Sequence, residues 1–316
     1  MSRIFWSLAL LLGSFWTLSG AAAEPDLAKL LSSSKRIVFL GDSITYSGQY
    51  VDDFTAWLET QPWEQIPEVI NVGLPSETVS GLSEEGHANG QFPRPDVAER
   101  LTRVLDVTKP DLVFVCYGMN CGIYQAFDEE RFLKYQQGIT AVRQAILARD
   151  AQVIHLTPPI YEDRVKPFDY SYNEVLDKYS KWLIGERANG WQVIDLHFPM
   201  QAALEKARTE NSSFKICPDA IHPNATGHWW MARELIRQFG DEAAADADSP
   251  EAMLAAKKVP VEVLKLVQER GHVLRDANLL ASGHKRPGIK TGLPLHTANE
   301  QAAKLTRQIR KLVKMP

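Results

Sequence analysis

Five short apolar runs, separated by longer segments with helical periodicity, constrain the fold of this chain more than any other feature. The runs are Arg36–Leu40, Glu68–Val72, Asp111–Tyr117, Gln152–Leu156 and Gln192–Leu196. Apolar residues recur mostly at helical spacing in the segments Tyr50–Glu59, Val97–Thr108, Glu129–Arg149, Tyr172–Asn189 and Ala225–Phe239. This alternation is typical of βαβ units, in which helices cover both faces of a parallel sheet. The sequence therefore predicts an α/β fold built on a five-stranded parallel sheet.

The composition is that of a globular protein with enough apolar residues for a large core. Of the 316 residues, 45% are hydrophobic and 23% are charged. The formal net charge of −4 is mild, so nothing in the composition favours nucleic acid as a partner.

The first 23 residues have the pattern of a secretory signal peptide. Arg3 is the only charged residue before Glu24, an apolar stretch runs from Ile4 to about Leu18, and three consecutive alanines end at Ala23. Polar residues interrupt the stretch, which is shorter than the roughly 20 apolar residues of a membrane anchor. We therefore expect cleavage after Ala23, no stable membrane insertion of the mature chain, and a periplasmic or extracellular location.

The composition of the chain changes after Gly240. We therefore predict one domain at residues 24–240 and a separate C-terminal segment at residues 241–316. Asp241–Ser249 is rich in Ala and Asp and predicts a linker or a frayed helix end. Residues 251–316 carry 13 Lys and Arg against 5 Asp and Glu, and their pattern predicts helices at Val261–Asn278 and Ala298–Val313. This basic extension either docks on the acidic remainder of the chain or binds an anionic partner.

A candidate serine nucleophile follows the first apolar run, in Gly41-Asp42-Ser43, and Asp219 and His222 lie three residues apart far downstream. A serine hydroxyl becomes an effective nucleophile when a histidine accepts its proton and a carboxylate orients that histidine. The Gly-Asp-Ser turn alone is also compatible with an aspartate that caps a helix. Together with Asp219 and His222, Ser43 predicts a hydrolytic triad.

Acyl transfer also needs hydrogen-bond donors directed at the developing oxyanion. Gly73 follows the second apolar run and offers a backbone N–H, and Asn120 follows the third and offers its side-chain amide. Strand-ending turns favour Gly and Asn for structural reasons as well. However, ligands of parallel sheets bind at the carboxyl ends of the strands, where all these positions fall. Gly73, Asn120 and the N–H of Ser43 are therefore the predicted oxyanion hole.

The segments Gly41-Asp42-Ser43, Gly73, Gly118-Met119-Asn120 and Asp219-x-x-His222 resemble, in order and spacing, the four sequence blocks of the SGNH hydrolases, also called GDSL esterases and lipases. The resemblance covers about residues 35–240. It implies a flavodoxin-like α/β/α sandwich with Ser43 as nucleophile, His222 as general base and then acid, and Asp219 as the orienting carboxylate. Because the family's hydrolases need no metal, neither a metal nor another cofactor is expected here. The basic extension is similar to extensions on secreted bacterial members.

Three cysteines are too few for a disulfide scaffold, although one bridge remains open in an oxidising compartment. The family often has Gly-x-Asn-Asp where this chain has Cys121 after Asn120, and Cys217 lies two residues before Asp219. Both cysteines are expected near the mouth of the site. We therefore predict a Cys121–Cys217 disulfide, with Cys116 as a buried free thiol; the alternative is three unpaired cysteines.

The predicted function is that of a secreted serine ester hydrolase whose partner is a small-molecule or glycan ester. An acetylated carbohydrate is the leading substrate because secreted members of the resembled family often remove acetyl groups from sugars. Two alternatives remain open: a lipase or lysophospholipase, and a catalytically silent glycan-binding module that has kept the fold. The sequence leaves the oligomeric state open.

Overall fold

The computed structural model describes residues 27–314, so the predicted signal peptide lies outside the described residues. One parallel sheet contains the strands β1 (Arg36–Gly41), β2 (Glu68–Asn71), β3 (Leu112–Cys116), β4 (Gln152–Leu156) and β5 (Gln192–Ile194). The strand order is β2-β1-β3-β4-β5, which is the order of flavodoxin-like doubly wound sheets. The predicted fold class is therefore confirmed.

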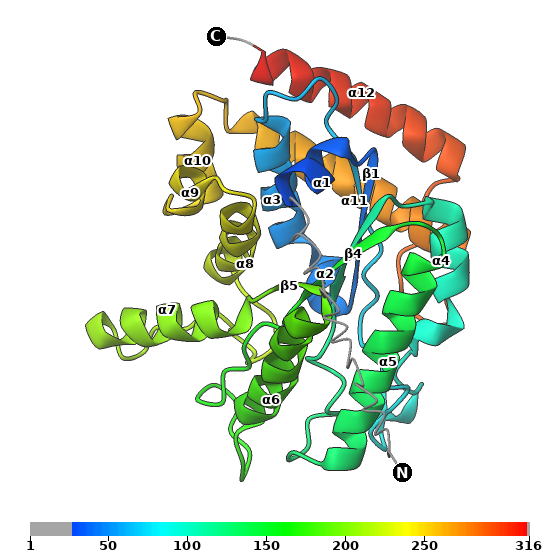
Figure 1. The fold of residues 1–316 in the computed structure, drawn as a ribbon, viewed down its shortest axis with the longest axis vertical. Coiled ribbons are helices and arrows are strands. Elements are labelled where there is room, and N and C mark those ends of the chain that lie inside the picture. The colour runs from blue at the N-terminus through cyan, green and yellow to red at the C-terminus, as the bar shows by residue number, and fades with distance from the viewer. Residues whose placement is uncertain (1–26, 315–316) are drawn as a thin grey trace, which may run out of the picture.

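Helices cover both faces of this sheet (Figure 1). On one face, α3 (Gln49–Glu59) and α8 (Ala225–Gln238) pack against each other. On the other face lie α4 (Leu101–Thr108), α5 (Glu129–Leu147) and α6 (Tyr172–Gly185), as right-handed crossovers require. Because both faces are covered, the central strand β3 is apolar throughout, and every one of its residues is buried.

A buried aromatic cluster fixes α3 to the sheet. The rings of Phe39 on β1 and Phe114 on β3 stack with their centroids 4.6 Å apart. Phe54 of α3 packs against both rings at 6.0 and 5.8 Å, and Phe239, directly after α8, completes the cluster. Since α2 (Ser43–Ser47) and α3 follow β1 directly, this cluster also stabilises the position of the turn between β1 and α2.

Several helices of the described residues fall outside the predicted elements. Neither α1 (Leu27–Ser33) nor α7 (His197–Glu210) was predicted, and α7 buries only His197, Met200 and Leu204, which is too few for a regular apolar stripe. The predicted linker contains the short helix α9 (Glu242–Ala245) and is followed by α10 (Pro250–Ala256). Asp241 holds this segment in place, because its Oδ2 accepts hydrogen bonds from Trp57 at 2.8 Å and Lys257 at 2.7 Å.

The basic extension ends in two long helices, α11 (Glu262–Ser282) and α12 (Leu295–Val313). α11 packs against α3, α4 and the edge strand β2, and α12 packs on α11. Covering β2 in this way protects an edge that would otherwise offer unpaired backbone groups. The extension thus docks on the rest of the chain, as one of the two alternatives predicts.

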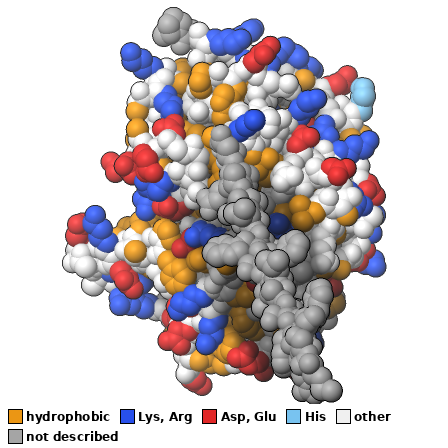
Figure 2. Space-filling view, viewed as in Figure 1, with side chains coloured by type: hydrophobic (Ala, Val, Ile, Leu, Met, Phe, Trp, Pro, Cys, Tyr) orange, Lys and Arg blue, Asp and Glu red, His pale blue; other side chains and the backbone are white. Residues whose placement is uncertain are grey.

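The outer face of α12 remains basic after this docking. Lys and Arg side chains lie along the top of the molecule (Figure 2), and Lys304, Arg307, Arg310 and Lys311 are exposed. Within residues 27–314, no helix combines the length and the apolar character that crossing a membrane requires.

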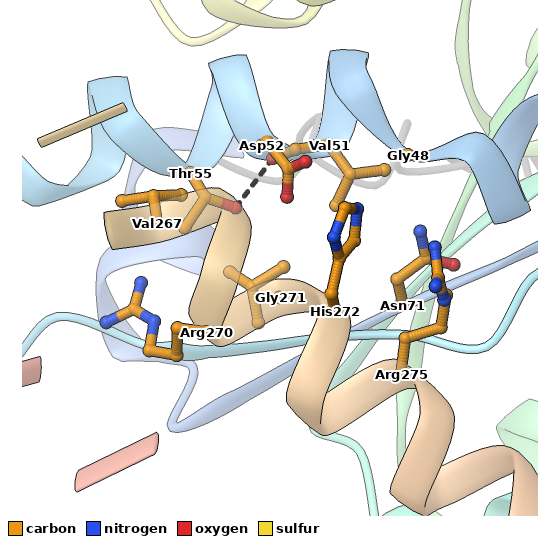
Figure 3. Close-up of a pocket in the computed structure, with 11 residues that line it drawn as sticks. Gly48, Val51, Asp52, Thr55, Asn71, Val267, Arg270, Gly271, His272 and Arg275 are labelled. Carbon is orange, nitrogen blue, oxygen red and sulfur yellow. Dashed lines mark hydrogen bonds between the residues drawn. The ribbon is translucent and has the colours of Figure 1, made fainter. Parts of the chain in front are cut away.

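A small polar cavity of about 10 Å³ lies between α3 and α11 (Figure 3), with room for about one water molecule. Asp52 of α3 lines it opposite Arg270 and Arg275 of α11. Among the described residues, Asp52 Oδ2 has no hydrogen-bond partner. Burial raises the pKa of Asp52 to about 7, and the attraction of Arg275 and Arg270 only partly offsets this.

Replacing Asp52 by asparagine is expected to change how stability depends on pH. The carboxyl ionises near its usual value of 3.8 in the unfolded chain and at about 7 in the folded chain. Between these values the folded state binds more protons, so the stability contributed by Asp52 is complete at low pH and is lost as the pH rises. The free energy of unfolding of Asp52→Asn relative to wild type should therefore increase by up to about 4 kcal/mol from pH 4 to pH 7. Urea unfolding of both proteins across this range measures the difference, and a difference independent of pH would contradict the assignment.

Candidate active site

The turn after β1 presents Ser43 as the first residue of α2 (Ser43–Ser47), a helix of little more than one turn. Asp42 caps this helix, since its Oδ1 accepts a hydrogen bond from the Ile44 N–H at 2.9 Å. Only glycine fits at position 41, because a Cβ there would lie 2.7 Å from the carbonyl oxygen of Cys116 on the neighbouring β3. Ser43 is thus held, partly exposed, at the carboxyl edge of the sheet.

A turn between Cys217 and α8 brings His222 and Asp219 to Ser43. His222 Nε2 lies 2.8 Å from Ser43 Oγ, and His222 Nδ1 lies 2.6 Å from Asp219 Oδ2. The other oxygen of Asp219 accepts hydrogen bonds from the backbone N–H groups of Ile221 at 3.0 Å and His222 at 2.8 Å. One carboxylate therefore both shapes the turn and orients the imidazole, and the three predicted residues form one hydrogen-bonded chain.

The Asp219–His222 pair lies at the surface, with 56% of the Asp219 side chain and 43% of the His222 side chain exposed. Partial burial acts to raise the pKa of Asp219, but hydrogen bonds from the His222 ring and from two backbone N–H groups outweigh it and lower that pKa. Asp219 is therefore ionised at neutral pH and can stabilise a protonated His222. The exposure of the pair leaves the site open on this side.

Asn120 lies in the loop after β3, the strand next to β1, and its side chain is held at both ends. Its Nδ2 donates to the carbonyl oxygen of Glu77 at 3.2 Å, and its Oδ1 accepts a hydrogen bond from the Tyr124 hydroxyl at 3.0 Å. Because an amide nitrogen carries two hydrogens, one N–H of Asn120 remains for a ligand. Tyr124 fixes which end of the amide is the donor.

Gly73 does not offer its N–H to a ligand. That N–H donates to Asn71 Oδ1 at 2.8 Å. A Cβ at position 73 would lie 2.4 Å from the backbone nitrogen of Tyr46, so glycine is needed there for close packing against α2. The prediction of Gly73 as an oxyanion-hole donor is therefore wrong, because its single N–H already has an acceptor.

The predicted Cys121–Cys217 disulfide is also wrong, since Cys116, Cys121 and Cys217 are all free and buried. Cys121 lies against the backbone of Val79, whereas Cys217 Sγ lies 3.9 Å from the carbonyl oxygen of Ile160. The two thiols thus have different surroundings, although their sequence neighbours both belong to the site. Cys116 is buried and free, as predicted.

Sequence reasoning missed the groups that hold Asn120. Glu77 is fully buried and receives two hydrogen bonds from Arg100, each 2.6 Å long, and one from the hydroxyl of Tyr117. This buried ion pair fixes the loop whose carbonyl group accepts from Asn120. The position of Tyr124, four residues after Asn120, is a weak sequence signal that the two side chains are in contact. Nothing in the sequence indicates that Glu77 belongs to the site.

Among residues 27–314, no three His, Cys, Asp or Glu side chains are grouped in a way that could hold a metal ion.

Comparison with known proteins gives one family match. The model of the GDSL-like lipase/acylhydrolase family matches residues 39–230, which extend from β1 into α8. No curated protein sequence matches the chain.

Several solved structures share the fold. A gut microbial diltiazem-metabolizing enzyme has 24% identity and a TM-score of 0.50, and the alignment covers 65% of this chain but only 47% of that enzyme. A catalytic mutant of Axe2, an acetylxylan esterase from Geobacillus stearothermophilus, has 19% identity and a TM-score of 0.50, with 65% of this chain and 94% of the esterase covered. LAE5, an alpha/beta hydrolase from the metagenome of Lake Arreo in Spain, has 19% identity and a TM-score of 0.50, with 65% and 95% covered.

Proposed function

The chain belongs to the GDSL-like lipase/acylhydrolase family, and on this premise we propose that it is a secreted serine ester hydrolase that removes short acyl groups, above all acetyl groups, from carbohydrates. The observation that carries the proposal is the hydrogen-bonded chain from Ser43 through His222 to Asp219 at the carboxyl edge of the sheet. Its geometry is that of a nucleophile, a base and the group that orients the base.

The proposed reaction has two halves. Ser43 Oγ attacks the ester carbonyl carbon while His222 Nε2 accepts the hydroxyl proton, and His222 then donates this proton to the departing alcohol. Water enters next, gives a proton to His222 and attacks the acyl-serine, and the acid leaves as the proton returns to Ser43. Asp219 stabilises the positive charge on His222 in both halves.

The oxyanion formed in each half is proposed to rest on two donors. These are the N–H of Ser43, at the first position of α2, and the N–H of Asn120 that does not bond to Glu77. Gly73 takes no part, because its N–H is engaged by Asn71.

Replacing Tyr124 by phenylalanine is expected to lower kcat about fivefold and to leave KM nearly unchanged. The variant loses the hydrogen bond that orients the Asn120 amide, and one such bond contributes about 1 kcal/mol. Steady-state kinetics on a short ester measure both constants. Tyr135→Phe is the matched control, because that buried hydroxyl donates to the backbone of Tyr117 at 3.3 Å and not to Asn120. Equal kcat values for Tyr124→Phe and Tyr135→Phe would contradict the role of Tyr124 in orienting Asn120.

The exposed Asp219–His222 pair supports a carbohydrate substrate, since an open site admits a bulky, hydrated alcohol group. The fold also carries an acetylxylan esterase, which is consistent with this substrate class. One observation favours longer acyl groups instead, namely a cavity of about 350 Å³ with a largely apolar surface. Its apolar lining comes from Leu74, Phe92, Pro93 and Pro95, and the charged residues Glu77, Arg94, Asp96, Glu99, Lys285 and Arg286 also line it. A lipase or lysophospholipase activity is therefore the second candidate.

Hydrolysis of p-nitrophenyl acetate, butyrate, octanoate and palmitate distinguishes these candidates, with acetate release from acetylated xylan as the carbohydrate assay. A preference for acetate and release from xylan are expected. A preference for octanoate or palmitate would replace the deacetylase by the lipase candidate. If no ester is hydrolysed and a fluorophosphonate fails to label Ser43, the chain is a silent binding module and the enzymatic proposal fails.

The secreted location rests on the composition of residues 1–23. Cleavage after Ala23 leaves Glu24 as the first residue of the mature protein. The mass of protein recovered outside the cytoplasm tests this, and an intact N-terminus would contradict it.

A further inference from the structure

The helix α11 of the extension contacts the helix that carries the proposed nucleophile. We propose that Arg275 of α11 is a positioning residue for Ser43, so that the basic extension is a working part of the active site and not only a cover for the sheet edge. The inference rests on the proposed function, in which Ser43 is the nucleophile. The extension lies beyond residues 39–230, which the family model matches, so this contact joins the matched region to a segment outside it.

The nucleophile helix cannot hold its own orientation. α2 spans only Ser43–Ser47, and a helix this short is not stable by itself. Its last carbonyl groups have no partners within the helix and need donors from elsewhere. Asn71 Nδ2 donates to the carbonyl oxygen of Thr45, and Arg275 Nη1 donates to that of Tyr46 at 2.8 Å. These two carbonyl oxygens thus accept from one residue of β2 and one residue of the extension, and Ser47 Oγ at the same end lies 3.3 Å from His228 Nε2 of α8.

Arg275 is well placed for this task. Its guanidinium carbon lies 4.2 Å from the centroid of the Tyr46 ring, so it contacts both the backbone and the side chain of that residue. Asp276 Oδ1 accepts from Arg275 Nε at 2.9 Å and from Nη2 at 2.8 Å, which fixes the plane of the guanidinium. Only 8% of Arg275 and 5% of Asp276 are exposed. Asn71 and Arg275 line the same cavity and lie side by side (Figure 3).

Further contacts hold the extension against the site. Arg286 Nε donates to the carbonyl oxygen of Pro75 at 3.2 Å, in the loop between β2 and Glu77. Arg103 of α4 donates to the carbonyl oxygens of Ser282 and Gly283 at 2.7 and 2.9 Å, where α11 ends. The extension therefore contacts two segments of the site, α2 and the loop after β2.

The test compares Arg275→Ala with Arg270→Ala in the full chain. Arg270 lies on the same helix with the same 8% exposure, but it contacts Glu59 at 2.7 Å and Thr306 at 3.1 Å and does not contact α2. We expect Arg275→Ala to lower kcat for p-nitrophenyl acetate about tenfold with little change in KM, and Arg270→Ala to keep kcat within about twofold of wild type. Both variants should lose thermal stability, so kcat and not stability separates them.

Two measurements separate positioning from general damage. Added guanidinium ion, at concentrations that leave wild type unchanged, should restore part of the kcat of Arg275→Ala in a saturable way and should not affect Arg270→Ala. Hydrogen exchange of the segment 42–50 should be faster in Arg275→Ala than in Arg270→Ala, and this measurement does not depend on activity. If wild type hydrolyses the ester while Arg275→Ala keeps its kcat and its exchange rate, the inference fails and the proposed function stands. If wild type is inactive but segment 42–50 exchanges faster in Arg275→Ala alone, the positioning holds and the proposed function fails.

Discussion

Replacing Ser43 by alanine is expected to lower kcat for p-nitrophenyl acetate by about 10⁶-fold. Without the hydroxyl, His222 Nε2 has no proton to accept at 2.8 Å and no acyl-enzyme can form. His222→Ala should cost about as much, because an un-ionised serine hydroxyl is a weak nucleophile. The double variant should be no slower than either single variant, since the two residues act as one unit.

Steady-state kinetics and fluorophosphonate labelling of the single and double variants test this prediction. Ser47→Ala is the matched control: Ser47 lies on the same helix, and its hydroxyl donates to the carbonyl oxygen of Ile44 at 2.8 Å. We expect its kcat to stay within a few-fold of wild type. The assignment of the nucleophile and base is wrong if kcat falls less than about 100-fold in Ser43→Ala. It is also wrong if the kcat losses of the two single variants multiply in the double variant.

Replacing Asp219 by asparagine is expected to lower kcat by roughly 10³-fold. An amide nitrogen facing His222 Nδ1 would favour the wrong tautomer of the imidazole, and in enzymes whose aspartate is buried this change costs about 10⁴-fold. Here 56% of the Asp219 side chain is exposed, so water can take over part of its interaction with protonated His222. The expected loss is therefore smaller than in a buried triad and smaller than for Ser43→Ala.

Comparing Asp219→Asn with Asp219→Ala separates orientation from turn structure. Asparagine keeps an oxygen to accept the backbone N–H groups of Ile221 and His222, whereas alanine removes that acceptor and should loosen the turn. We expect Asp219→Ala to be at least as slow as Asp219→Asn and to unfold at a lower temperature. If kcat falls less than tenfold in both variants, a group other than Asp219 orients His222.

The fold was predictable because its two sequence signals are local. These signals are short apolar runs for the strands and helical spacing of apolar residues for the helices. Strand β4 has the predicted bounds Gln152–Leu156, and the other strands differ from their predicted bounds by no more than two residues at either end. Helices α3 and α5 follow their apolar spacing closely. The helix α7 was missed because it buries few side chains, and its position depends on tertiary contacts such as the 2.7 Å interaction of His197 with Asp177.

The site was predictable where the reaction demands a residue type and not where packing decides the partner. Ser43, Asp219 and His222 were predicted because acyl transfer by a serine needs these residue types, and the structure brings them within hydrogen-bond distance of one another. Gly73 was misassigned because the sequence does not show that Asn71 accepts its only N–H. The disulfide was misassigned because two cysteines can both neighbour site residues in sequence and still have different surroundings.

The sequence by itself determined the sheet, its covering helices and the three residues of the hydrogen-bonded chain. The spacing of apolar residues and the presence of reactive residue types can both be read directly from the sequence. Only the tertiary structure decided which groups hold those residues in place. Tyr124 orients Asn120, Asn71 engages Gly73, and Arg275 reaches Tyr46 across 229 positions of the chain. The physical reason is that a hydrogen bond depends on distances of about 3 Å and on direction, and both are set by the packing of segments that are remote in sequence.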